Sequence, residues 1–158
     1  MAGPRILIVE DEAIVAHNLA DRLRELGYEA LAPLSSGEEA VRQATAVRPD
    51  LVLMDVRLPG GMDGIAAAQE IRERTAIPVV YLTGYADRAT LERAKVTEPF
   101  GYVLKPFEMR DLHSTIEMAL YRHRAELELW RYREHLEELV EERTAELALE
   151  VAVRRRAE

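Results

Sequence analysis

The stretch Ile6-Leu7-Ile8-Val9-Glu10-Asp11-Glu12 decides the fold. Its first four residues are apolar without polar alternation, which is typical of a strand buried on both faces of a parallel sheet. Comparable apolar runs occur at 51–54, 79–82 and 102–104, and a weaker one at 28–34. These runs are five candidate strands.

Segments of helical period separate these runs. Apolar residues recur at helical spacing from Val15 to Leu26, and Gly27 follows in the position of a helix C-cap. Further helices are expected after Ser36 and over 65–74 and 89–97. Strand and helix therefore alternate, and this order predicts an α/β fold with a parallel sheet, helices on both faces and right-handed crossovers.

The last third of the chain has a different pattern. No proline or glycine occurs after Pro106, and the composition turns to Glu, Arg, Leu and Ala, which predicts one long helix from about Asp111 to Val153. We expect one domain over 1–122 and a helical coiled-coil extension or linker over 123–158.

The extension carries an apolar stripe with coiled-coil spacing and a stutter, interrupted at Arg143 or Thr144. Its members are Leu129, Tyr132, Leu136, Val140, Leu147 and Val151. The stripe predicts a parallel homodimer, and a solvated single helix is the alternative. The segment 136–147 also looks like the helical linkers that precede sensor or histidine kinase modules, so an N-terminal fragment of a multidomain protein is a further alternative.

Composition limits the class of protein. A chain of 158 residues with 48% hydrophobic content can bury one ordinary core. The net charge of -8 disfavours direct nucleic-acid binding, and the absence of cysteine excludes disulfides and thiolate sites. No apolar run is long enough for a membrane span and no signal-peptide pattern opens the chain, so we expect a soluble, cytoplasmic protein without a membrane partner.

Residues with reactive side chains follow the ends of the predicted strands. They are Glu10, Asp11, Asp55, Thr83 and Lys105. Ligands of open parallel sheets collect outside the carboxyl ends of the strands, so we expect these side chains to share one edge. Carboxylates that close repel one another and need a cation, and hard oxygen ligands suit Mg2+. Asp55 is then a candidate nucleophile toward phosphorus, with Glu10 and Asp11 on the metal and Lys105 on the acquired phosphoryl charge.

Five segments in order resemble one known family. They are 6–12, 54–59, 62–64, 81–84 and 102–107. The chain from about Arg5 to Arg122 resembles the receiver domain of bacterial two-component response regulators. This resemblance implies a flavodoxin-like, doubly wound five-stranded sheet of order 2-1-3-4-5. It also implies phosphorelay signalling, in which a histidine kinase or phosphotransfer protein is the partner.

The resemblance also implies roles for single residues. Asp55 looks like the phosphoacceptor, Asp11 like the direct Mg2+ ligand, and Glu10 like a ligand that acts through water. The backbone carbonyl of Arg57 would complete the protein ligands of the metal, and Lys105 would pair with the phosphate. No catalytic turnover is expected beyond self-catalysed phosphoryl acceptance and hydrolysis.

Two further residues resemble the conformational switch of that family. Thr83 looks like the hydroxyl that turns toward the phosphoryl group, and Tyr102 like the aromatic side chain that follows it inward. The expected outcome is a changed surface on the fourth helix, fifth strand and fifth helix, relayed to the long helix.

Two other functions are weighed against this one. An aspartyl phosphohydrolase of the haloacid-dehalogenase pattern needs a second Asp two residues after the nucleophile, but Arg57 stands there. An interaction module that works without phosphate would not need Glu10, Asp11, Asp55, Thr83 and Lys105 together.

The loop after Pro59 is one residue longer than the common family form, which affects only local geometry.

Overall fold

The computed structural model describes residues 3–84, 88–95 and 97–157. Contacts between Cα atoms divide the chain into two compact units, Met1–Arg122 and His123–Glu158. The first unit contains the sheet and its helices, and the described residues of the second, 123–157, all belong to one helix.

The first unit is built on a five-stranded sheet of order β2-β1-β3-β4-β5. The strands are β1 (Arg5–Val9), β2 (Glu29–Ala30), β3 (Leu51–Asp55), β4 (Val79–Thr83) and β5 (Gly101–Leu104). Every neighbouring pair is parallel. The predicted parallel sheet and its flavodoxin-like order are confirmed.

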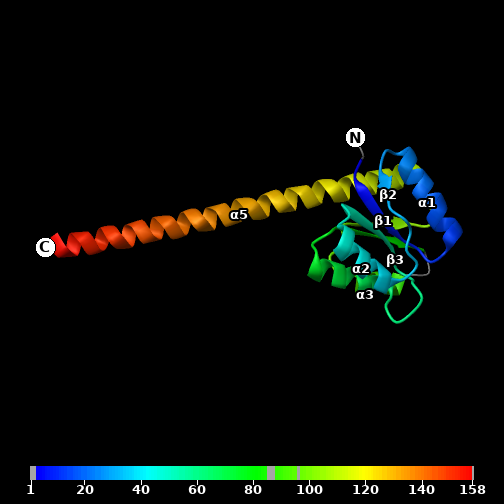
Figure 1. The fold of residues 1–158 in the computed structure, drawn as a ribbon, viewed down its shortest axis with the longest axis horizontal. Helices are drawn as coiled ribbons and strands as arrows, with labels where there is room; N and C mark the ends of the chain where they lie inside the picture. The colour runs from blue at the N-terminus through cyan, green and yellow to red at the C-terminus, as the bar shows by residue number, and fades with distance from the viewer. Residues whose placement is uncertain (1–2, 85–87, 96, 158) are drawn as a thin grey trace. The chain divides into compact units, whose positions relative to one another are not determined.

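Helices cover both faces of this sheet, as Figure 1 shows. They are α1 (Ala13–Glu25), α2 (Gly37–Val47), α3 (Gly64–Arg74), α4 (Arg88–Lys95) and α5 (Met109–Ala157). Alternate residues of β3 enter two separate cores. Leu51 and Leu53 pack with α1 and the start of α5, whereas Val52 and Met54 pack with α2 and α3. Strands buried on both faces explain the unbroken apolar runs.

The ends of two helices follow the sequence signals. Gly27, just beyond α1, has a φ of +94°, a conformation that favours glycine. Ser36 caps α2, because its hydroxyl accepts a hydrogen bond from the Glu39 backbone N–H at 3.3 Å.

The second strand is shorter than predicted. A strand over 28–34 was expected, but β2 covers only two residues, and an isolated bridge joins Val9 to Leu34. Pro33 is the physical reason, since proline has no backbone N–H to donate to the β1 ladder. The N–H of Leu31 donates to Ile6, and the next donor to β1 is that of Leu34, which reaches the carbonyl of Ile8. The chain therefore bulges around Pro33.

The long helix is confirmed, and it runs four residues beyond the predicted end at Val153. Within the first unit its buried residues are Leu112, Ile116, Ala119 and Leu120. No helix in the described part of the chain is both long and apolar enough to cross a membrane.

Candidate functional site

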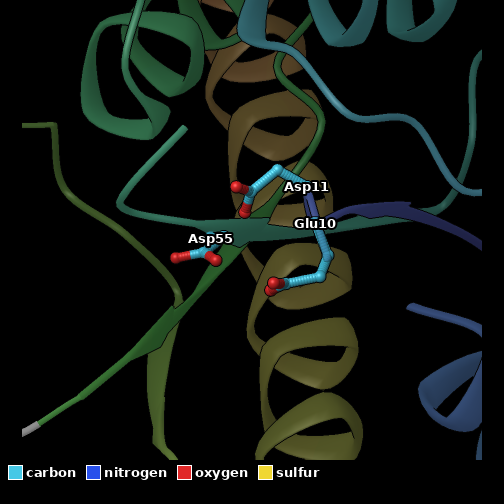
Figure 2. A group of neighbouring side chains, drawn as sticks. All are labelled: Glu10, Asp11 and Asp55. Atoms are coloured by element: carbon cyan, nitrogen blue, oxygen red, sulfur yellow. The ribbon is translucent and has the colours of Figure 1, made fainter. Parts of the chain in front are cut away.

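Three carboxylates meet at the carboxyl ends of β1 and β3, as Figure 2 shows. Glu10 and Asp11 follow β1 directly, and Asp55 is the last residue of β3. One carboxylate oxygen of each lies within 4.8 Å of those of the other two. Glu10 and Asp55 are buried, with 2% and 6% of their surface exposed, while Asp11 is exposed.

Lys105 joins two of these carboxylates. Its Nζ donates to Oε2 of Glu10 at 2.8 Å and to Oδ2 of Asp55 at 2.9 Å. The residue follows β5, and its backbone N–H donates to the carbonyl of Thr83 at 2.7 Å, which holds the ends of β4 and β5 together. The peptide bond between Lys105 and Pro106 is cis.

The second oxygen of Asp55 is also held. Oδ1 accepts a hydrogen bond from the Arg57 backbone N–H at 3.0 Å. Behind Asp55 the start of α3 approaches very closely, because a Cβ atom on Gly64 would lie 1.9 Å from the Asp55 carbonyl oxygen. The Gly64 N–H donates to the carbonyl of Val56 at 3.1 Å. Only glycine fits at this position.

Burial and charge shift the ionisation of the site. Burial, reinforced by the hydrogen bond with Asp55, raises the pKa of Glu10 to about 7. Burial acts to lower the pKa of Lys105, but its hydrogen bonds with Glu10 and Asp55 outweigh burial and raise that pKa above its usual range. The ammonium group of Lys105 contacts two of the three carboxylates, so the negative charge of the cluster would favour a further cation.

The two expected switch residues lie on different strands and differ in burial. Thr83 ends β4 and is buried, next to Leu82, which pairs in register with Asp55. Its hydroxyl donates to the Gly84 carbonyl at 3.3 Å, a long hydrogen bond that leaves the side chain weakly held. Tyr102 lies on β5 with 39% of its surface exposed and stacks on Tyr81.

Two residues of this region were missed by the sequence reasoning. Tyr81 is buried in the apolar run of β4, and burial raises its pKa to about 12, so its hydroxyl keeps its proton. Asp63 caps α3 by accepting from the Ala66 N–H at 2.8 Å, and it also pairs with Arg93 of α4 at 3.3 Å. An Asp-Gly pair before a helical segment is a cap signal that could have revealed Asp63.

Comparison with known proteins identifies the family. The sequence model of one protein family, the response regulator receiver domain, matches residues 6–117 of this chain. The chain belongs to this family. The predicted resemblance is therefore confirmed, and the chain carries a receiver domain of two-component signalling systems, which is a signalling module.

Curated relatives extend beyond the matched part. The transcriptional regulatory protein PdtaR of Mycobacterium tuberculosis is 45% identical over 120 residues, covering 76% of this chain and 58% of PdtaR. The positive alginate biosynthesis regulatory protein of Pseudomonas aeruginosa is 37% identical over 124 residues, covering 77% of this chain and 49% of that protein. The chain thus spans about half the length of these relatives.

Solved structures share the fold over the same part. The signal receiver domain of a modulated diguanylate cyclase from Desulfovibrio desulfuricans is 40% identical, with a TM-score of 0.75 over 78% of this chain and 98% of that one. The receiver domain of a sensor histidine kinase from Pseudomonas aeruginosa is 34% identical, with a TM-score of 0.69 over 75% of this chain and 98% of that one. That structure has a magnesium ion coordinated in its active-site cleft.

Proposed function

We propose that Asp55 accepts a phosphoryl group, in a Mg2+-dependent reaction, from the phosphohistidine of a histidine kinase or phosphotransfer protein. The observation that carries this proposal is the contact of Lys105 with both Glu10 and Asp55, beside Asp11. An ammonium group already placed on the acceptor carboxylate can pair with the charge that a phosphoryl group brings.

The donor set fits a magnesium ion. Glu10, Asp11 and Asp55 supply hard carboxylate oxygens, one of them on an exposed side chain, and Mg2+ prefers one or two carboxylates together with water and phosphate. The backbone carbonyl of Arg57 is the further ligand that we propose. A bound Mg2+ would supply charge neutralisation for the phosphoryl oxygens.

The chemistry required of the protein is a displacement at phosphorus. An oxygen of Asp55 forms a bond to phosphorus, and the bond between phosphorus and the donor imidazole nitrogen breaks with its electron pair leaving on that nitrogen. Both Asp55 oxygens accept hydrogen bonds here, one from Lys105 and one from the Arg57 backbone. An oxygen that accepts one hydrogen bond still has a lone pair for the attack, and Lys105 can then move to a phosphoryl oxygen.

A groove beside the site gives a partner protein room to approach. It has a volume of about 400 Å3 between α1 and the segment after β5, and Lys105 forms part of its wall. Ile14, which is 86% exposed, lines the groove together with Asn18 and Phe107. A mainly apolar groove that reaches the reactive lysine is a suitable surface for the phosphodonor.

For the response to phosphorylation, we propose that Thr83 and Tyr102 form the switch. The weakly held Thr83 hydroxyl can turn to a phosphoryl oxygen without losing a strong hydrogen bond. Tyr102 can then move inward toward the space that Thr83 leaves, because it is partly exposed and lies on the neighbouring strand. The surface of α4, β5 and α5 would change as a result.

We further propose that the helix over 123–158 pairs with a second copy as a parallel coiled coil. Leu129, Tyr132 and Leu136 are between 42% and 61% exposed and lie at a, d and a positions of a heptad. In a parallel pair, Glu128 at g faces Arg133 at e of the second copy, so opposite charges flank the stripe twice by symmetry. Burying the stripe is worth about 25 cal/mol per Å2 of apolar area.

Intact-mass analysis tests the phosphoacceptor. Incubation with acetyl phosphate and Mg2+ should add one phosphoryl group to the wild-type chain and none to Asp55→Asn. Asp21→Asn is the matched control, because Asp21 is an exposed carboxylate of α1 paired with Arg24, and it should be modified like the wild type. Modification of Asp55→Asn would place the nucleophile elsewhere.

A further inference from the structure

The buried hydroxyl of Tyr81 ties β4 to the end of α4. It lies 2.8 Å from Oγ1 of Thr97, which donates in turn to the carbonyl of Ala94 at 2.6 Å. Because the only hydroxyl proton of Thr97 is used on Ala94, Tyr81 must be the donor in the first bond. Tyr81, Thr97 and Ala94 are all buried, so this two-bond chain is shielded from water.

The ring of Tyr81 is also the platform on which Tyr102 lies. The two residues are register partners of β4 and β5, and their ring centroids are 6.1 Å apart with an interplanar angle of 30°. Stacked rings at this separation attract each other. The inner ring is completely buried and the outer one partly exposed, so only Tyr102 is free to change its place.

Thr83 completes the arrangement. Alternate residues of a strand point to the same face, so Thr83 shares the face of β4 that carries Tyr81. If Tyr102 moves toward Thr83, its ring has to slide along the ring of Tyr81. We propose that Tyr81 is a positioning residue that transmits this movement through Thr97 to the end of α4. The inference rests on the proposed function, since the movement follows phosphorylation of Asp55.

The ion pairs that link α4 and its following loop to the rest of the unit are weaker than these buried hydrogen bonds. Arg93 pairs with Asp63 at 3.3 Å and Arg72 with Glu98 at 2.6 Å, and all four side chains are at least one-third exposed. Exposed ion pairs contribute little, because water and salt screen them. The buried hydrogen bonds from Tyr81 are therefore a stronger polar link between the sheet and this end of α4 than these ion pairs.

Hydrogen exchange of the full chain, read by mass spectrometry on a peptide covering 88–98, tests the inference. The two states compared are the chain alone and the chain with Mg2+ and beryllofluoride, a stable mimic of the acyl phosphate. In the wild type the exchange rate of this peptide should differ between the states. In Tyr81→Phe, which keeps the stacked ring but loses the donor, that difference should shrink about threefold or more.

Two further variants separate transmission from simple loss of stability. Thr97→Val removes the same bond from the other side, and the double variant should shrink the difference no further than either single change. Thr75→Val is the matched control, because Thr75 is a buried threonine at the end of α3 whose hydroxyl donates to the carbonyl of Ile71 at 2.6 Å. It should retain the wild-type difference.

The outcomes are distinct. If Tyr81→Phe exchanges faster in both states but keeps the wild-type difference between them, the Tyr81 hydroxyl has only a structural role. The inference is then overturned. Acetyl phosphate and intact mass report separately on Asp55, and Tyr81→Phe should be phosphorylated to the wild-type extent. A wild type that accepts no phosphoryl group would instead overturn the proposed function.

Discussion

Lys105 donates from Nζ to a carboxylate oxygen of Glu10 at 2.8 Å, although 95 residues separate them in the chain. The contact lies at the edge of the sheet where β1 and β5 both end, and the same ammonium group also holds Asp55. Lys105 therefore supplies part of the charge compensation that a bound cation would also supply. It offsets the repulsion between two buried carboxylates.

This contact predicts that Lys105→Ala destabilises the metal-free protein. Removing the ammonium leaves Glu10 and Asp55 buried without their cationic donor, which should lower the free energy of unfolding by about 2 kcal/mol. Urea unfolding in the presence of a chelator measures the loss. Mg2+ should restore more stability to this variant than it adds to the wild type, because it replaces the missing charge.

Lys95→Ala is the control for that measurement. Lys95 pairs with Glu92 at 3.0 Å, but both side chains are largely exposed, so its loss should change the free energy of unfolding by less than about 0.5 kcal/mol. Equal effects of the two substitutions would show that the Lys105 contacts contribute no more than a surface pair.

The raised pKa of Glu10 predicts a pH-dependent affinity for Mg2+. With a pKa of about 7, Glu10 keeps a proton in acidic solution, and that proton competes with the metal for the carboxylate. The affinity should therefore rise as the pH increases from 5.5 through 7 and level off about one unit above that pKa, at pH ~8. Isothermal titration calorimetry across this range measures it, and Glu10→Gln should give a flatter profile. A wild-type affinity that does not change with pH would contradict the assignment of Glu10 to the metal.

Gly64 predicts a backbone effect on the phosphoacceptor. In Gly64→Ala the new methyl group would lie 1.9 Å from the Asp55 carbonyl oxygen, so α3 or the end of β3 must shift. We expect a loss of about 2 kcal/mol or more in the free energy of unfolding and slower phosphorylation by acetyl phosphate. Gly61→Ala is the matched control, because its nearest neighbour is the Glu38 carboxylate at 3.8 Å, and it should behave like the wild type.

Much of this fold follows from the sequence because its strands are buried on both faces. Runs such as Ile6 to Val9 have no polar face, and this pattern identifies the central strands of a parallel sheet. The edge strand β2 has no such protection, and its length depends on where Pro33 breaks the ladder with β1. A hydrophobicity pattern contains no information about that register.

Part of the candidate site could also be predicted from the sequence. Parallel strands end at one edge, so the meeting of Glu10, Asp11 and Asp55 could be inferred from their places after the strands. The partner of the Tyr81 hydroxyl could not be inferred from the sequence. Thr97 reaches it from the turn that follows α4, where Glu98 has a φ of +49°, and local propensity does not predict such a conformation for glutamate.

The proposed parallel pairing of the helix over 123–158 predicts the effect of a charge reversal. In Arg133→Glu two like charges, at positions 128 and 133, would face each other on both sides of the apolar stripe. The pair should weaken by about 1–2 kcal/mol, which is roughly 5- to 30-fold in the dimer dissociation constant. Sedimentation equilibrium at low salt measures this constant.

The double variant Glu128→Lys with Arg133→Glu is the decisive control. It exchanges the two charges, so a parallel pair in this register regains the attraction and should return to near the wild-type dissociation constant. An antiparallel pair or a different register brings other residues opposite positions 128 and 133 and has no reason to be rescued. A wild-type chain that sediments as a monomer at tens of micromolar would contradict the pairing itself and would favour the solvated single helix.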